Sequence, residues 1–142
     1  MRTRLFRILF AVTVIVVAGI LLWPQHVDVA ISDYIFHLAI PLEHRVVIYA
    51  VFEAGSNVLL FIPLGLFASL WLSRWWMAIL TGFAMSAIFE TVQLALPGRT
   101  ASLFDVLWNT IGASIGVSIG WVWERFRRSR QGATTAGGAD ER

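Results

Sequence analysis

Four long apolar stretches are the feature that most limits what this chain can fold into. A helix that crosses the hydrocarbon core of a bilayer needs about 20 mostly apolar residues, with a usual range of about 17 to 25. Four segments meet or nearly meet this length, and they are residues 5–23, 57–72, 75–96 and 102–123. Hydrophobic residues make up 58% of the 142-residue chain and charged residues only 14%, a balance that excludes an ordinary soluble core. The sequence therefore predicts an all-α integral membrane protein, a bundle of four transmembrane helices.

The charges indicate how the helices are oriented. All eleven basic residues are arginines. Most of them precede the first span, lie between the second and third, or follow the fourth; these are Arg2, Arg4, Arg7, Arg74, Arg125, Arg127, Arg128 and Arg130. Short loops rich in arginine stay in the cytoplasm. Four spans with both termini cytoplasmic satisfy this rule, whereas three or five spans would not. The arginines are thus topology signals, and the sequence predicts no nucleic-acid partner.

Three regions of the chain follow from this topology. Residues 1–128 form the predicted membrane domain. Within it, residues 24–56 are an external segment that we expect to lie on the membrane surface. The first span resembles a secretory signal, but no good cleavage site follows it, so we expect an uncleaved anchor. Residues 129–142 are rich in glycine, alanine and threonine without an apolar period, which predicts a disordered cytoplasmic tail.

Polar side chains within the predicted spans are candidate functional residues, because such groups are expensive in a bilayer. Glu90 and Gln93 are three residues apart and share one helix face near the outer end of the third span. Asp105 and Asn109 share a face at the start of the fourth span. Asn57 lies at the predicted start of the second span, or inside it if that helix begins in the preceding apolar run at residues 46–52, and it can join the same layer. With the arginine of the intervening turn, these residues form what we call the polar cluster: Asn57, Glu90, Gln93, Arg99, Asp105 and Asn109.

A stripe of small residues continues the polar face of the fourth span. We call it the glycine stripe, and its members are Gly112, Gly116 and Gly120. Glycines at this spacing allow another helix backbone to approach closely, so they predict helix packing. The short turn at residues 97–100 makes the third span the expected neighbour. Glu90 and Asp105 would then approach each other, and either Arg99 neutralises one carboxylate, a cation joins the two, or one keeps its proton.

Other chemistries find little support. The chain has no cysteine, which excludes disulfides and thiolate chemistry. Its three histidines, in the external segment, lack metal-ligand spacing, and no glycine-rich phosphate loop is present. The sequence predicts no metal and no cofactor. A purely structural role is an alternative for the polar cluster, since Gln93 and Asn109 in particular can join helices by hydrogen bonds.

The order and spacing of these residues resemble the VanZ-like family of small bacterial integral membrane proteins. The resemblance rests on the run Asn-Val-Leu-Leu-Phe-Ile-Pro-Leu-Gly at residues 57–65, on Glu90-x-x-Gln93 and Arg99, and on Asp105-x-x-x-Asn109-x-x-Gly112, and it covers residues 52–120. It implies a multi-pass protein of the bacterial inner (plasma) membrane. The namesake of the family is associated with resistance to the glycopeptide teicoplanin. Membership implies a place in the cell envelope but no particular reaction.

Three functions of different class fit the sequence. The leading hypothesis is a protein of unassigned molecular activity whose outward polar cluster binds a lipid headgroup, cell-wall precursor or glycopeptide, with Arg99 as the anion contact. The first alternative is a membrane-embedded enzyme acting on a lipid-linked substrate, with Glu90 or Asp105 as general base. No serine, histidine and acid set lies in the membrane layer, which weighs against an enzyme without deciding the question. The second alternative is a small ion-coupled transporter, which would need an oligomer.

Overall fold

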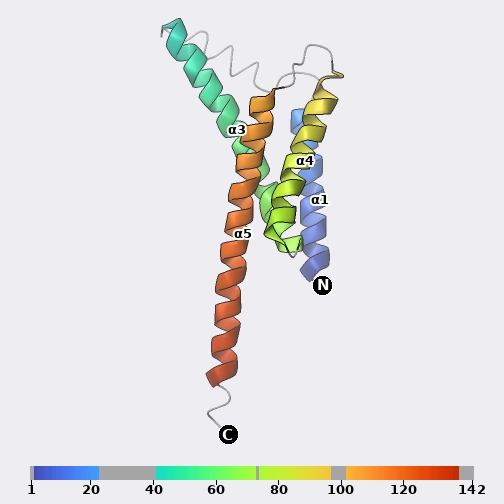
Figure 1. The fold of residues 1–142 in the computed structure, drawn as a ribbon, viewed down its shortest axis with the longest axis vertical. Coiled ribbons are helices and arrows are strands. Elements are labelled where there is room, and N and C mark those ends of the chain that lie inside the picture. Colours follow the sequence, from blue (N-terminus) through green and yellow to red (C-terminus); the bar gives the residue numbers. More distant parts are fainter. Residues whose placement is uncertain (1, 23–40, 73, 97–101, 138–142) are drawn as a thin grey trace.

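A computed structural model describes residues 2–22, 41–72, 74–96 and 102–137 of the chain. This part of the chain folds into four helices and no strand (Figure 1), and they are α1 (Arg2–Leu21), α3 (Leu42–Trp71), α4 (Trp75–Gln93) and α5 (Leu103–Gly137). Each helix is long and apolar enough to cross a membrane. The prediction of an all-helical protein with four membrane-crossing helices is confirmed.

The second membrane-crossing helix begins earlier than expected. α3 starts at Leu42, directly after Pro41, so the predicted start at residue 57 is wrong, and residues 42–56 of the predicted external segment belong to this helix. Its 30 residues extend over ~45 Å, more than the ~30 Å of a hydrocarbon core. Helix formation is uninterrupted here because the run from 42 to 56 contains no proline. The rest of the predicted external segment, residues 24–40, lies outside the described residues.

The last helix also continues further than the sequence suggested. α5 extends to Gly137, whereas we expected a disordered tail from residue 129. Once a helix is nucleated, each added residue costs little, and no proline ends the helix in this region. Residues 138–142 of the predicted tail lie outside the described residues. In Figure 1, α5 runs well past the ends of the other helices.

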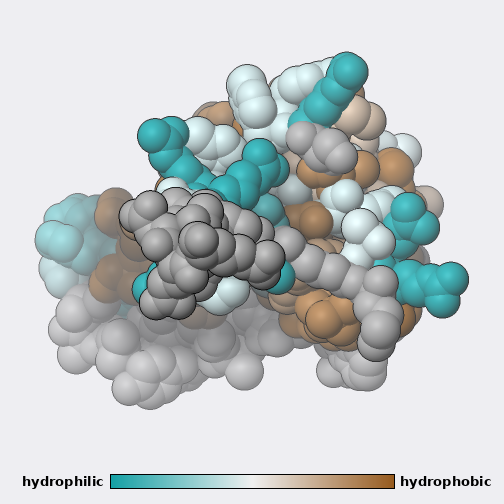
Figure 2. Space-filling view, turned by 90° about the horizontal axis from the view of Figure 1, so that it is seen from below, coloured by the Kyte–Doolittle hydropathy of each residue, from teal (hydrophilic) through white to brown (hydrophobic). Residues whose placement is uncertain are grey.

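Successive helices run in opposite directions, so the bundle has two chemically different ends (Figure 1). At the first, which we call the arginine end, α1 begins, α3 and α4 are joined, and α5 continues past the bundle. The arginines there whose side chains the structure describes are Arg4, Arg7, Arg74, Arg125, Arg127, Arg128 and Arg130. Figure 2 looks onto this end and shows hydrophilic residues around it, with hydrophobic residues between them. At the opposite end, the polar end, α1 and α4 finish and α5 begins.

The glycine stripe of α5 packs against α3. A Cβ atom built on Gly112 would collide with the carbonyl oxygen of Val58, and one on Gly116 would collide with that of Ile62. The two backbones are therefore in direct contact, as small residues in membrane helices allow. We expected α4 as the neighbour of this stripe, and that expectation is wrong. α4 also packs along α5, where a Cβ on Gly82 would collide with the side chain of Ala113, but the glycine stripe itself faces the backbone of α3.

The core lies where all four helices meet. It contains Val17 of α1, Phe61 and Leu64 of α3, Phe89 of α4 and Ala113 of α5. The rings of Phe61 and Phe89 meet edge to face, with centroids 6.4 Å apart, a favourable aromatic geometry. Most other large apolar side chains point outward, as expected for a bundle whose surface faces lipid. This core is next to the polar cluster along the helices: Phe89 directly precedes Glu90 on α4, and Phe61 lies one turn after Asn57 on α3.

Candidate functional site

The polar end brings most of the polar cluster into the interior of the bundle. Asn57, Glu90, Gln93 and Asn109 are buried, and Asp105 is half-buried. These side chains come from α3, α4 and α5. Arg99 lies outside the described residues, so its role as an anion contact stays a prediction.

Asn57 and Asp105 connect α3 to α5. The amide nitrogen Nδ2 of Asn57 donates to Oδ1 of Asp105 at 2.9 Å. Asp105 lies in the first turn of α5, where a carboxylate interacts favourably with the unpaired backbone N–H groups of the helix start. The pair was not obvious from the sequence, because Asn57 and Asp105 are 48 residues apart. It places a half-buried acid at the rim of the polar end.

Glu90 connects α4 to the residue that precedes α5. Its Oε2 accepts a hydrogen bond from the backbone N–H of Ser102 at 3.0 Å. Only 7% of Glu90 is exposed, so this bond forms largely out of contact with solvent. We had expected the carboxylates of Glu90 and Asp105 to face each other. In these two contacts, each carboxylate accepts from a neutral donor on a different element, and a direct approach of Glu90 to Asp105 stays a prediction.

Gln93 binds the end of α1. Its Nε2 donates to the backbone carbonyl oxygen of Leu21, the last residue of that helix, at 2.9 Å. The final carbonyl groups of a helix have no partner within the helix, and a buried one needs a donor from elsewhere. Gln93 supplies this donor from the last residue of α4. The polar ends of α1 and α4 are thereby joined.

Asn109 connects α5 to α4 and retains an unused acceptor. Its Nδ2 donates to Oγ of Ser86 at 2.9 Å, in a position where neither residue is more than 1% exposed. Oδ1 of Asn109 has no hydrogen-bond partner among the described residues. A buried carbonyl without a donor costs about 1–3 kcal/mol. Such atoms usually have a specific reason to be retained, such as a water molecule or ligand that satisfies them.

Sequence reasoning missed Ser86, although a signal for it was present. Ala78, Gly82 and Ser86 follow one another at intervals of four residues, and Glu90 continues the series. All four are buried on the same face of α4. A stripe of small residues that ends in an acid predicts a closely packed helix face, as the glycine stripe did on α5. The carbonyl oxygen of Leu21 had no comparable signal, because it belongs to the backbone.

Fold and site together define a class of protein, a multi-pass membrane protein whose helices are joined at one end by buried polar side chains. Within that class, the chain belongs to the VanZ/LLP1 family, whose model matches residues 9–124. The match includes most of α1 and extends on both sides of residues 52–120, where the sequence motifs lie. No curated protein and no solved structure matches the chain.

Proposed function

We propose that this protein resides in the bacterial inner (plasma) membrane with both termini in the cytoplasm, and that its polar end binds the polar part of an envelope molecule at the outer face. The arginines support this orientation. Apart from Arg45 near the start of α3, the arginines that the structure describes lie at one end of the bundle, and short arginine-rich loops and helix ends stay cytoplasmic. The polar cluster would then face the compartment that contains lipid headgroups, cell-wall precursors and glycopeptides.

The observation that carries the proposal is the acceptor character of the polar cluster. Asp105 is a half-buried carboxylate whose contact with Asn57 occupies one of its two oxygens. One turn deeper, Oδ1 of Asn109 is a buried acceptor without a donor. An ionised carboxylate and an amide oxygen both call for hydroxyl or amide donors. Sugars and peptides supply many of these, which favours a cell-wall precursor or glycopeptide as the ligand.

Arg99 complements these acceptors in the proposed site. It belongs to the turn that joins α4 to α5 and is the one basic residue between Trp75 and Trp123. A guanidinium recognises phosphate and carboxylate groups through paired N–H donors. Lipid-linked precursors combine such a phosphate with sugar hydroxyls and peptide amides. In this proposal the arginine contacts the anionic group while Asp105 contacts a donor.

Charge at Asp105 separates a binding role from a purely structural one. An asparagine at this position can still accept the hydrogen bond from Asn57, so Asp105→Asn preserves the link between α3 and α5 but removes the negative charge. If the residue only joins helices, the variant should behave like the wild type. A site that binds a ligand through the carboxylate should lose function while the fold remains intact.

The experiment compares growth of a deletion strain in the native host, across glycopeptides and envelope stresses, with matched expression of each complementing protein. We expect Asp105→Asn and Arg99→Ala to fail like the deletion, while their melting temperatures in detergent stay close to that of the wild type. Glu43→Gln is the matched control, because Glu43 is an exposed acid on α3 outside the cluster. Full complementation by both cluster variants would overturn the proposal.

A binding measurement addresses the ligand directly. Purified protein in nanodiscs is titrated with a fluorescently labelled lipid-linked cell-wall precursor, and fluorescence anisotropy reports the bound fraction. We expect wild type and Glu43→Gln to bind alike, and Asp105→Asn to bind at least about tenfold more weakly, as when a charged hydrogen-bond partner is lost. Chromatography of the same mixtures should show the precursor unchanged. A new product would instead support the enzymatic alternative.

A further inference from the structure

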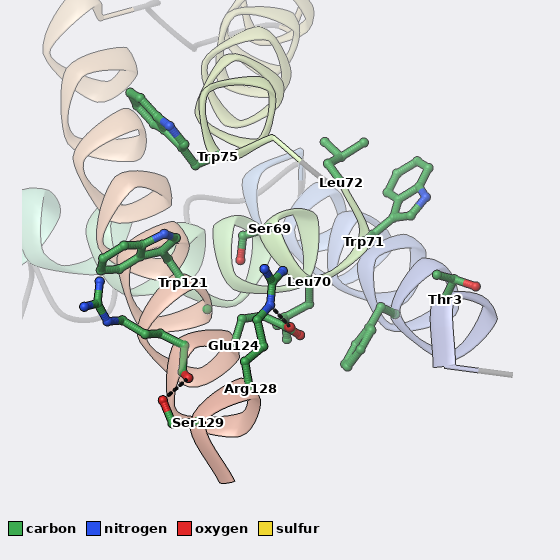
Figure 3. A pocket seen from close by; sticks show the side chains of 13 residues that line it. Thr3, Ser69, Leu70, Trp71, Leu72, Trp75, Trp121, Glu124, Arg128 and Ser129 are labelled. Carbon is green, nitrogen blue, oxygen red and sulfur yellow. Dashed lines mark hydrogen bonds and ion pairs between the residues drawn. The ribbon is translucent and has the colours of Figure 1, made fainter. Parts of the chain in front are cut away.

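The arginine end contains a hollow of about 690 Å³, at the opposite end of the bundle from the polar cluster. It lies between the start of α1, the adjoining ends of α3 and α4, and the later turns of α5 (Figure 3). Its lining is mixed. The cationic side chains come from α5, the hydroxyl side chains from α1, α3 and α5, and the tryptophans Trp71, Trp75 and Trp121 from α3, α4 and α5.

Two arginines of α5 give the hollow its charge. Arg128 lies 4.0 Å from a carboxylate oxygen of Glu124, at the limit of an ion pair, and its side chain is 83% exposed. Figure 3 shows the Arg128 side chain reaching from α5 toward Ser69 on α3. Arg125 lies over the ring of Trp121, with its guanidinium carbon 5.5 Å from the centroid. A guanidinium has five N–H donors, so one long contact or a stacked ring leaves most of them for an anion.

Two hydroxyl groups of the hollow, those of Ser69 and Ser129, are placed to accept hydrogen bonds. Oγ of Ser69 donates to the carbonyl of Leu66 at 2.8 Å, and Oγ of Ser129 donates to the carbonyl of Arg125 at 3.2 Å. Each hydroxyl hydrogen is thereby used within the protein, while the oxygen lone pairs stay available. Glu124 adds a carboxylate acceptor to the same lining. The hollow therefore presents donors for an anion beside acceptors for hydroxyl hydrogens.

The apolar lining indicates where such a ligand comes from. Phe6, Leu70 and Leu72 extend the tryptophan surface along the hollow. Tryptophan is characteristic of the depth at which lipid headgroups meet the hydrocarbon. A free anion would gain nothing from this surface, whereas a phospholipid would place its glycerol and first acyl carbons against it. The arginines at this end would also concentrate anionic lipid nearby.

We propose that this hollow binds an anionic phospholipid whose phosphodiester contacts Arg125 and Arg128 and whose headgroup hydroxyls face Ser69, Ser129 and Glu124. The site is separate from the polar cluster, at the opposite end of the bundle. A phosphate with a choline group fits less well, because a quaternary ammonium has no hydroxyl hydrogen to donate and is repelled by the arginines. Phosphatidylglycerol has both the net negative charge and the hydroxyls.

The test is native mass spectrometry of the full chain released from detergent in an equimolar mixture of phosphatidylglycerol and phosphatidylcholine with identical acyl chains. The ratio of the two bound lipids is measured. We expect the wild type to retain one phosphatidylglycerol preferentially. Arg125 and Arg128 each donate charge-assisted hydrogen bonds to the phosphodiester in this proposal, so the variant Arg125→Gln/Arg128→Gln should lose at least about 25-fold in preference.

Two further variants distinguish binding in the hollow from a general attraction of anionic lipid to the arginines of this end. Arg127→Gln makes the same charge change on the same helix, but Arg127 does not line the hollow, so its preference should stay within about twofold of wild type. Ser129→Trp fills the hollow from an exposed position without removing an arginine, and it should also abolish the preference. Retained preference in both the double variant and Ser129→Trp would overturn the proposal. An equal loss in Arg127→Gln would do the same.

A competition arm distinguishes a lipid from a free anion. Glycerol phosphate carries the same headgroup chemistry without acyl chains. We expect it to leave the bound phosphatidylglycerol in place at millimolar concentration, because the tryptophan and leucine surface contributes only to a lipid. Complete displacement would show an anion site and overturn the assignment to a phospholipid. Size-exclusion elution and circular dichroism of each variant confirm that only folded protein is compared.

Discussion

The side-chain amide of Asn109 donates to Oγ of Ser86 at 2.9 Å, and this hydrogen bond joins α5 to α4 at a point almost completely removed from the surface. It lies between the closely packed small residues below and the polar end above. Because the bond is well formed and enclosed, it restricts the rotation of α5 relative to α4. That rotation in turn determines where Asp105 lies, one turn closer to the end of the helix.

Removing the acceptor of this bond should destabilise the protein. Ser86→Ala leaves Nδ2 of Asn109 buried without a partner, and we expect a loss of about 1–2 kcal/mol in the free energy of unfolding. Equilibrium unfolding in mixed micelles, followed by circular dichroism, measures the change. Ser118→Ala is the control, because Ser118 is exposed and bonds only to the carbonyl of Ser114 on its own helix. Equal losses in the two variants would contradict the role given to Ser86.

Adding one methyl group to the glycine stripe should separate α5 from α3. In Gly116→Ala the new Cβ would collide with the backbone of Ile62 and Leu66, which cannot move aside as a side chain can. We expect a loss of about 1–3 kcal/mol in the free energy of unfolding, as for overpacked cores.

The matched control for that substitution is Gly19→Ala. Gly19 also lies within a helix, but a Cβ there meets nothing within 4 Å. Its replacement should stabilise the helix by up to about 1 kcal/mol, because alanine is the better helix former. The two substitutions are chemically identical, so opposite signs would isolate the contact with α3. A loss of similar size at both positions would argue against backbone contact as the cause.

Gln93 should protect the end of α1 from opening. Gln93→Leu removes the donor to the carbonyl of Leu21, and we expect faster hydrogen exchange at the last amides of α1, including that of Leu22, which bonds to Ala18. Exchange followed by mass spectrometry locates the effect. Thr91→Val is the control, because Thr91 is exposed and bonds only within α4. Unchanged exchange in Gln93→Leu would mean that the end of α1 is held by other contacts.

The orientation of the bundle is open to a direct chemical test, since the chain has no cysteine of its own. His44→Cys places a thiol at the exposed start of α3, and Ser129→Cys places one at an exposed position near the end of α5. A membrane-impermeant maleimide added to intact cells should label the first variant and should reach the second only after the membrane is permeabilised. The reverse pattern would invert the proposed topology and place the polar cluster on the cytoplasmic side.

Asn57 illustrates what the sequence could predict and what it could not. The number of helices follows from apolar length, which is a property of composition along the chain. The start of α3 stays open in the sequence, because an apolar run at residues 46–52 precedes Asn57 and a polar residue is compatible with a helix start and with a helix interior. In the structure Asn57 lies inside the helix, and its side chain bonds to Asp105 on α5.

Helical periodicity alone also could not predict which helices contact each residue of α5. Asp105 and Asn109 were correctly assigned to one face, but residues four apart on a helix still differ by about 40° in direction. Since α5 lies between α3 and α4, this difference is enough to direct Asp105 to Asn57 on α3 and Asn109 to Ser86 on α4. Spacing identified the residues that face inward. The choice between two adjacent partners depended on three-dimensional packing.

The contact between the glycine stripe and α3 has a consequence for how such chains can diverge. Gly112 and Gly116 meet the carbonyl oxygens of Val58 and Ile62, atoms that every amino acid possesses. A substitution at Val58 or Ile62 leaves these carbonyl oxygens in place. A side chain at Gly112 or Gly116 would overlap them. Mutational tolerance across this interface should therefore be one-sided, with variation accumulating on α3 while the α5 positions stay restricted to glycine.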